Sequence, residues 1–255
     1  MNKLFNEDIE LFFKKRVKSE TIDLIIADPP YNVLEIEWDM FKSELEYFTF
    51  MKKWLIYAFD SLKEGGTLYL FNTAYNSGKL ISIIEKIGYH FIDWITWYKK
   101  DGFTGSKKKY VNNQETILFF SKGKNWKFNY NEIRTPYVAT ERLKHAAEKG
   151  ILKNGKRWFP NEKGKLCTNV WEFSSERHNT KVKGKVIKGF HPTPKPSKLI
   201  ERIVLASSDK NDLVLDLFSG TGTTTFICKN LNRNSLGCEL NKEYYEYAIK
   251  RIGVK

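Results

Sequence analysis

Short apolar runs alternate with amphipathic stretches in both flanks of the chain. The run TIDLIIA at 21–27 is rich in β-branched residues and stops at Asp28-Pro29-Pro30, which is typical of a buried parallel strand. Runs of this kind predict strands at 21–27, 67–71, 89–98, 115–121, 212–218 and 235–240. Apolar residues at helical spacing predict helices at 43–62, 77–87, 198–207, 223–231 and 242–252.

Strands that alternate with helices of this length predict βαβ units, and therefore an α/β fold with a doubly wound, mostly parallel sheet. The stretch from about 102 to 189 breaks this pattern, because its periodicity is weak and it is rich in Gly, Asn and Lys. We interpret it as an inserted recognition region. With 255 residues, the chain is long enough to bury its own core.

Positive charge is concentrated in the same central stretch. The whole chain has a formal net charge of +13, and residues 99–188 hold 22 Lys and Arg against 8 Asp and Glu. The remainder is close to neutral. Aromatic residues such as Tyr110, Trp126 and Trp158 are interleaved with the basic ones. This pattern favours a polyanion partner, with nucleic acid as the first candidate, although a solvated lysine-rich surface would look the same.

A glycine-containing turn, Ser-Gly-Thr-Gly at 219–222, follows the very apolar strand predicted to end near Phe218. Such a turn allows close approach of a ligand, and the helix after it offers free N–H groups. Glu239 ends the next predicted strand, where a carboxylate can accept hydrogen bonds from ribose hydroxyls. These features predict an adenosine cofactor. They do not separate a nicotinamide dinucleotide from S-adenosylmethionine, and a turn without a ligand stays open because Thr225 replaces a third glycine.

A second loop, Asp28-Pro29-Pro30-Tyr31, also follows a buried strand. The carboxyl ends of strands are where open α/β sheets bind ligands. Two consecutive prolines remove two backbone donors and stiffen the loop, so the Asp28 carboxylate and the Pro29 carbonyl can converge as acceptors beside an aromatic ring. The alternative is a rigid turn with a capping Asp and a packing Tyr.

Together these residues resemble the amino-methyltransferases that modify exocyclic NH₂ groups in DNA. The catalytic motif of that family, (D/N/S)PP(Y/F/W), matches 28–31, and its cofactor motif, FxGxG, matches 218–222. The catalytic motif comes first, as in the permuted β arrangement of restriction–modification enzymes. Further matches are Asn6-Glu7-Asp8, Trp38-Asp39, Phe71-Asn72-Thr73 and the segment HPTPKP at 191–196. The central stretch looks most similar to MboII-type adenine-N6 enzymes.

This resemblance implies a Rossmann-like methyltransferase sheet that carries a basic target-recognition insert. Residues 1–101 would form the catalytic half, residues 102–189 the target-recognition region, and residues 190–255 the cofactor-binding half. It also implies methyl transfer from S-adenosylmethionine to N6 of an adenine flipped out of duplex DNA. Asp28 and Pro29 would bind the amino group, Pro30 would stiffen the loop and Tyr31 would stack on the base.

The cofactor-binding residues that the resemblance implies come from both flanks of the chain. They are Asp8, Asp28, His191, Thr193, Lys195, Asp216, Phe218, Ser219, Gly220, Thr221, Gly222, Thr223, Thr224 and Glu239. Asp8 could instead be only the N-cap of a short helix, and Lys195 only a surface charge.

Candidate DNA contacts are chosen by side-chain type within the basic stretch. They are Lys107, Lys108, Lys109, Arg134, Arg142, Lys144, Arg157, Arg177 and His178. The lysines and His178 are candidates for phosphate contacts, and the arginines are candidates for base contacts. For each arginine, a solvated charge is the equal alternative to a base contact. The resemblance suggests a short asymmetric target such as GAAGA, a separately encoded restriction endonuclease as partner, and a homodimer.

Three alternatives remain open. A cytosine-N4 methyltransferase would use the same chemistry, although Asp at the first motif position favours adenine in this family. A catalytically silent DNA-binding protein is disfavoured because the motif residues are all present. A protein-glutamine methyltransferase is disfavoured because its motif begins with Asn and follows its cofactor loop.

Other residue types exclude some classes of protein. The three cysteines include no CxxC pair, and the four histidines show no ligand spacing, so we expect no metal and no disulfide scaffold. The N-terminal residues lack the apolar core of a signal peptide, and no run is apolar enough to span a membrane. We therefore expect a cytoplasmic protein.

Overall fold

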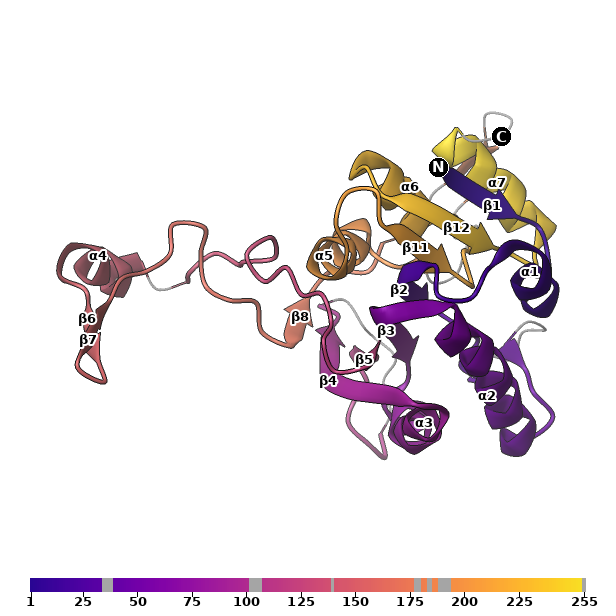
Figure 1. Cartoon of the computed structure of the whole chain (residues 1–255), viewed down its shortest axis with the longest axis horizontal. Helices are drawn as coiled ribbons and strands as arrows, with labels where there is room; N and C mark the ends of the chain where they lie inside the picture. Colours follow the sequence, from indigo (N-terminus) through magenta and orange to yellow (C-terminus); the bar gives the residue numbers. More distant parts are fainter. Residues whose placement is uncertain are drawn as a thin grey trace.

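The computed structural model describes residues 1–33, 39–100, 107–138, 140–176, 180–182, 185–187 and 194–253. Its centre is an eight-stranded sheet (Figure 1). The strands lie in the order β1 (Asn2–Phe5), β12 (Asn234–Cys238), β11 (Leu213–Asp216), β2 (Ile22–Ala27), β3 (Leu62–Asn72), β5 (Gln114–Lys122), β4 (Tyr89–Tyr98) and β8 (Val170–Glu172). Within this sheet only β5 runs against the others. The predicted α/β class with a mostly parallel sheet is therefore confirmed.

Helices cover both faces of the sheet. One face packs against α1 (Ile9–Arg16), α2 (Glu44–Ser61) and α3 (Ala74–Ile87), and the other against α5 (Ser197–Ser207) and α6 (Thr223–Asn230). The last helix, α7 (Lys242–Ile252), packs beside β1 through a small cluster of Leu4, Ala248 and Ile252. The central strands β2, β5, β11 and β12 are mostly buried, which explains why their sequences read as continuous apolar runs.

Two strands have boundaries that differ from the predicted ones. The strand predicted for 212–218 ends at Asp216, because the side chain of Asp216 accepts a hydrogen bond from the Phe218 N–H at 3.2 Å and turns the chain. β3 begins at Leu62 rather than at 67, directly after α2. The pattern did not predict β1 or α1, since β1 has four residues and only Leu4 of them is buried.

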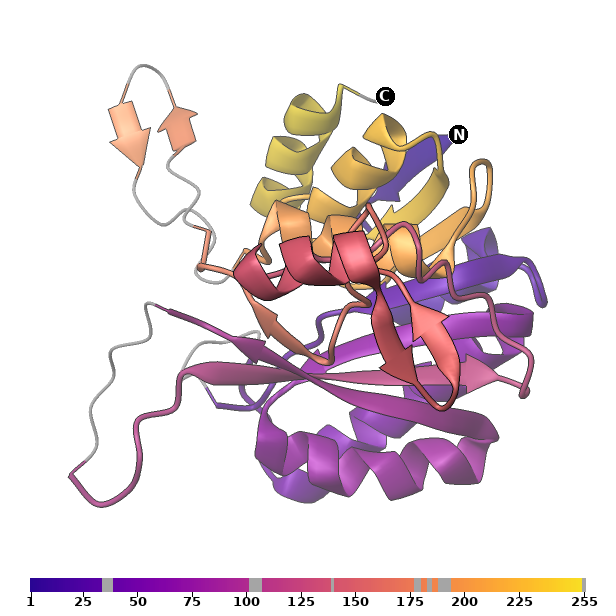
Figure 2. The same ribbon diagram turned by 90° about the vertical axis from the view of Figure 1, so that its left-hand side faces the viewer.

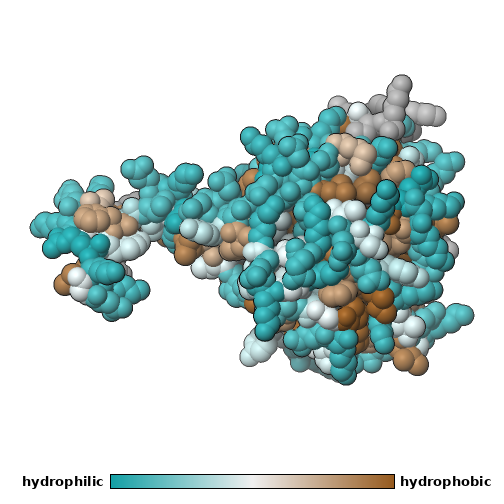
Figure 3. Space-filling view, in the orientation of Figure 1, coloured by the Kyte–Doolittle hydropathy of each residue, from teal (hydrophilic) through white to brown (hydrophobic). Residues whose placement is uncertain are grey.

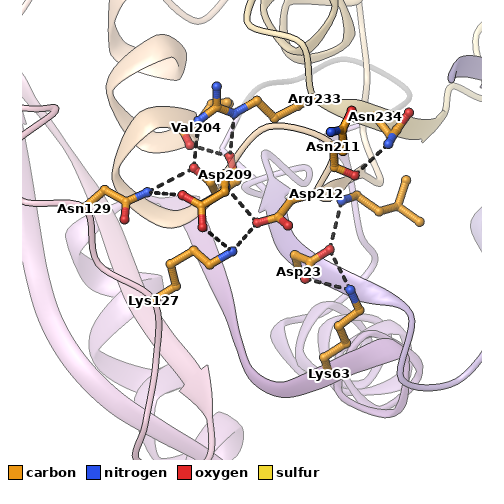
Figure 4. Close-up of polar contacts among 12 residues, drawn as sticks. Asp23, Lys63, Lys127, Asn129, Val204, Asp209, Asn211, Asp212, Arg233 and Asn234 are labelled. Carbon is orange, nitrogen blue, oxygen red and sulfur yellow. Dashed lines mark hydrogen bonds and ion pairs between the residues drawn. The ribbon is translucent and has the colours of Figure 1, made fainter.

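The predicted insert is partly sheet. β5 lies inside the range 102–189 but pairs between β3 and β4, and β8 rejoins the sheet beside β4. After β5, Lys127 pairs with Asp209 and Asp212, and Asn129 donates hydrogen bonds to the Ser208 carbonyl and to the Asp209 carboxylate (Figure 4). These contacts of Lys127 and Asn129 anchor the chain beside the sheet. The segment that leaves the sheet therefore begins after residue 129.

Beyond the anchor, the chain forms an arm that contains α4 (Thr140–Lys149), β6 (Ile151–Lys153) and β7 (Lys156–Trp158). The arm projects away from the sheet and its surface is largely hydrophilic (Figures 1 and 3). The hairpin of β9 (Thr180–Val182) and β10 (Lys185–Ile187) and the stretch 107–113 project on one side of the sheet (Figure 2). These segments are the basic part of the chain.

Gly222 connects the glycine turn to α6, and its backbone is left-handed at φ +75°. A Cβ there would lie 2.7 Å from Cδ1 of Ile252 and 2.9 Å from Cβ of Ala248, both on α7. We expect Gly222→Ala to lower the free energy of unfolding by roughly 2–4 kcal/mol, measured by urea denaturation. The matched control is Gly253→Ala, which also has positive φ (+63°) but meets only the Lys229 ammonium at 3.8 Å. An equal loss in both variants would contradict a role for Gly222 in packing α7.

Candidate functional site

Both predicted loops line one cavity of about 770 Å³ at the carboxyl edge of the sheet. β2 leads directly into the Asp28 loop, β11 leads into the glycine turn, and the two strands are adjacent. Fourteen of the predicted residues line the cavity: Asp8, Asp28, Pro29, Pro30, Tyr31, Lys195, Asp216, Phe218, Ser219, Gly220, Thr221, Thr223, Thr224 and Glu239. Gly222 is not part of the wall, because it contacts α7 instead. His191 and Thr193 lie outside the described residues.

The catalytic loop is held by side chains from outside the motif. The buried carboxylate of Asp39 accepts hydrogen bonds from the N–H groups of Tyr31, Asn32 (3.1 Å) and Val33 (2.8 Å). The amide of Asn76, on α3, donates to the Tyr31 carbonyl at 2.7 Å. Three backbone donors on one carboxylate fix the course of the chain after the prolines. The sequence match at 38–39 pointed to Asp39 without indicating this role.

Asp28 lies in a cluster of charged side chains. Its Oδ1 accepts a hydrogen bond from the Tyr31 hydroxyl at 2.7 Å, and its Oδ2 lies 2.6 Å from the ammonium of Lys195. Glu115, the second residue of β5, contacts the same hydroxyl at 3.2 Å and lies 3.5 Å from the Lys195 ammonium. Lys99, just after β4, forms an ion pair with Glu115. Sequence reasoning missed Glu115 and Lys99, because neither lies in a recognisable motif.

Opposing effects set the charges of this cluster. Burial raises the pKa of Asp28, and the Lys195 ammonium counteracts this effect only in part. Burial also acts to raise the pKa of Glu115, but Lys195 and Lys99 outweigh it and leave that pKa below its usual value. Burial acts to lower the pKa of Lys195, but the two carboxylates raise it overall. Lys195 is therefore a buried cation, and its contacts place it with the catalytic motif.

The side of the cavity formed by the glycine turn is built on backbone donors and carboxylates. Glu239 accepts hydrogen bonds from the N–H groups of Gly220 and Asn241, both at 2.7 Å, and burial raises the pKa of Glu239. Asp8 caps α1 by accepting from the Glu10 N–H at 2.9 Å, and it also lines the cavity, so the capping contact does not exclude the predicted cofactor role. Tyr244 and Asn241 complete this wall and were not predicted.

The candidate DNA contacts differ in what they do within the chain. Arg134 donates hydrogen bonds to Asn131 and to the Gly164 carbonyl, both at 2.8 Å, and so holds the base of the arm together. Arg157 donates to the Lys149 carbonyl, which links β7 to α4. Exposed lysines are Lys107, Lys108, Lys109 and Lys144. Only the backbone of Arg142 is described, and Arg177 and His178 lie outside the described residues.

Two kinds of feature are absent from the described residues. No group of His, Cys, Asp and Glu side chains in that part of the chain could hold a metal ion. None of its helices is long and apolar enough to cross a membrane.

A doubly wound sheet with these two motif loops at one cavity defines a methyltransferase of the amino-methylating class. The profile of the DNA methylase family matches residues 22–250, and the chain belongs to this family. It is a DNA methyltransferase of the restriction–modification type, as its resemblance to MboII-type enzymes predicted.

Two type II methyltransferases are similar to this chain over most of its length. Over 236 residues the chain is 51% identical to the type II methyltransferase M1.MboII of Moraxella bovis, covering 92% of this chain and 91% of that protein. It is 37% identical to M.HpaI of Haemophilus parainfluenzae, covering 93% and 70%.

Solved structures share the fold. A complex of M1.HpyAVI with SAM has a TM-score of 0.65 at 24% identity and covers all of both chains. The cytosine-N4-specific PvuII DNA methyltransferase has a TM-score of 0.73 at 18% identity, covering 98% of this chain and 86% of that one. A fold common to such enzymes does not by itself distinguish the target base.

Asp216 gives the site a measurable pH dependence. Burial raises its pKa from 3.8 to about 7. Between pH 4 and 7 the unfolded chain holds Asp216 ionised while the folded protein resists ionisation, so stability falls as pH rises through this window. We expect wild type to lose up to about 1.4 kcal/mol per pH unit relative to Asp216→Asn, with no further loss above pH 7. Urea denaturation of both proteins from pH 4.5 to 8 measures this difference, and a constant difference would refute it.

Proposed function

We propose that this protein transfers a methyl group from S-adenosylmethionine to the exocyclic N6 of adenine in duplex DNA. The observation that carries the proposal is that the Asp28 loop, the glycine turn and Glu239 line one cavity. A base acceptor and a cofactor site in the same cavity are what a direct transfer between the two requires.

The chemistry of the cavity favours S-adenosylmethionine over a dinucleotide. Its wall includes seven carboxylates and two lysines: Glu7, Asp8, Asp28, Asp39, Glu115, Asp216, Glu239, Lys99 and Lys195. A pyrophosphate would be repelled there, whereas the sulfonium and ammonium groups of S-adenosylmethionine are cationic. Glu239 would hold the ribose, and the buried Asp216 carboxylate would gain a partner in the cofactor's ammonium group. When bound, the cofactor supplies an electrophilic methyl group.

The chain's own residues prepare the amino group. Its nitrogen is a weak nucleophile because the lone pair is delocalised into the base. The Asp28 carboxylate and the Pro29 carbonyl would accept its two N–H hydrogen bonds and localise the lone pair, and Asp28 would stabilise the positive charge that develops on nitrogen. The base must first leave the duplex, and stacking on Tyr31 would offset part of the unstacking free energy.

The basic region would supply DNA binding. We propose that residues 1–101 and 190–255 form the catalytic and cofactor-binding halves, and that 102–189 is the target-recognition region, of which the arm is the projecting part. The resemblance of the motifs to MboII-type adenine-N6 enzymes implies an adenine target within a short asymmetric site such as GAAGA, and a separately encoded endonuclease as partner, and both are part of the proposal. A homodimer is also part of the proposal.

Asp28→Ala tests the catalytic assignment. We expect this variant to bind DNA and cofactor with near wild-type affinity but to transfer methyl at least about 10²-fold more slowly, because the acceptor that activates the amino group is missing. Transfer of tritiated methyl to unmethylated bacteriophage DNA measures the rate. Digestion of the product to nucleosides identifies the base, and N4-methylcytosine instead of N6-methyladenine would overturn the adenine assignment. A wild-type protein that binds DNA and transfers no methyl would overturn the enzymatic proposal.

Lys153 and Lys156 test the role of the arm, because both lie in exposed positions of the β6–β7 hairpin. If both contact phosphates, Lys153→Gln with Lys156→Gln should flatten the log–log dependence of DNA affinity on salt by about 1.8. Lys14→Gln with Lys15→Gln is the matched control, since these exposed lysines lie on α1 at the opposite end of the molecule (Figure 1). Equal slopes in the two double variants would refute the contact.

A further inference from the structure

Two carboxylates and two lysines meet beneath the Asp28 loop. They come from the ends of β2 and β4, the start of β5 and the residue pair before α5. Lys195 has 8% of its side chain exposed, and Glu115 has 12%. Burial on this scale is unusual for charged residues, and they tolerate it because each is paired. The reaction proposed above uses Asp28 of this cluster and gives Glu115 no task.

The contacts restrict the position of Lys195. Its ammonium lies 2.6 Å from Oδ2 of Asp28 and 3.5 Å from Oε2 of Glu115. The rings of Tyr31 and Phe71 lie at 5.5 Å and 5.3 Å from it. Glu115 is itself tied by Lys99 through its other oxygen. Lys195 is therefore held between two carboxylates and two aromatic rings.

We propose that Glu115 is a positioning residue for methyl transfer, which acts by holding the Lys195 ammonium against Oδ2 of Asp28. Asp28 then presents a carboxylate whose second oxygen, Oδ1, accepts a hydrogen bond from the Tyr31 hydroxyl at 2.7 Å. A target amino group that displaces this hydroxyl finds an ionised acceptor of fixed orientation. The inference rests on the proposed function, since it concerns the same acceptor.

The charge of Asp28 matters because a protonated carboxyl would be a donor on one oxygen and a poorer acceptor on the other. Burial favours that protonated form, and Lys195 opposes it. Glu115 acts on Asp28 in two ways that have opposite signs. Its negative charge directly raises the pKa of Asp28, while its grip on Lys195 keeps the opposing cation in place. Among the described residues, Tyr31 and, on β11, Asp216 also interact with Asp28, and Lys99 pairs with Glu115.

Three variants separate charge from position. Glu115→Gln keeps the size of the side chain and removes its charge. Glu115→Asp keeps the charge and withdraws it by one methylene. Lys195→Met removes the cation.

The first measurement is the carboxyl titration of Asp28 by ¹³C NMR, in protein without cofactor or DNA, with the Asp28 signal assigned by its loss in Asp28→Asn. We expect the titration midpoint to rise in Lys195→Met and to stay near the wild-type value in Glu115→Asp. In Glu115→Gln we expect a smaller shift than in Lys195→Met, because the loss of the Glu115 charge and the loss of its hold on Lys195 act in opposite directions. This measurement does not depend on the proposed function.

The second measurement is kcat and KM for unmethylated bacteriophage DNA between pH 5.5 and 9. We expect both Glu115 variants to lower kcat about 10- to 100-fold with little change in KM, and raising the pH should not restore it, because position and not ionisation is lost. In Lys195→Met, kcat should fall at neutral pH and recover in part at higher pH as Asp28 ionises.

The matched control is Asp212→Asn, which removes a carboxylate that pairs with Lys127 near the opposite edge of the sheet (Figure 4). Its kcat and its Asp28 titration should match the wild type even if its thermal stability falls.

Wild-type kcat in a folded Glu115→Gln or Glu115→Asp protein would overturn the inference, as would a loss of kcat in these variants that is restored at high pH. An Asp28 titration midpoint that is unchanged in Lys195→Met would also overturn it, because Lys195 would then not control the charge of Asp28. A wild type without methyl transfer would refute the proposed function, and the NMR titrations would still decide whether Lys195 and Glu115 control Asp28.

Discussion

The pairing of β2 with β11 is the constraint on which the rest of the site depends. In this register Ile26 lies opposite Asp216, so the residues that follow each strand leave the sheet side by side. From β2 the chain crosses to β3, and from β11 it crosses to β12, in opposite directions along the sheet. The crevice opened by this divergence is where the two motif loops meet. A shift of one residue in the register would turn every buried side chain of β2 to the other face and separate Asp28 from the glycine turn.

The same pairing explains how a permuted chain builds a single site. The two strands belong to opposite flanks, and the basic region lies between them in the sequence. Lys195 comes from the second flank and completes the charge environment of Asp28 in the first. The first flank also contributes to the second, because β1 of the first flank pairs with β12 of the second. Each half therefore supplies groups that the other lacks, and the core of neither is closed without its partner.

Periodicity was sufficient to predict the central strands and helices, since these are buried elements whose apolar runs are long and bounded by Pro or Gly. It could not predict β1, which has one buried side chain, or β8, which has three residues and depends on pairing with β4. The motif residues were found because they follow strand ends. Glu115 and Asp39 were not assigned a role, because they act through contacts between distant segments. Gly222 was correctly identified as a special position, but its required conformation serves packing against α7 as well as the turn.

The basic stretch and the cavity wall carry opposite charges, and this difference determines which groups each of them attracts. The basic excess lies in residues 99–188, whereas the described cavity wall is rich in carboxylates. In the proposed function, a phosphate backbone would be attracted to the first and repelled by the second, so the DNA backbone would stay outside the cavity while an uncharged base could enter it. The carboxylates would also favour a cationic group over a phosphate in the proposed cofactor site. One separation of charge would thus discriminate base from backbone and sulfonium from pyrophosphate.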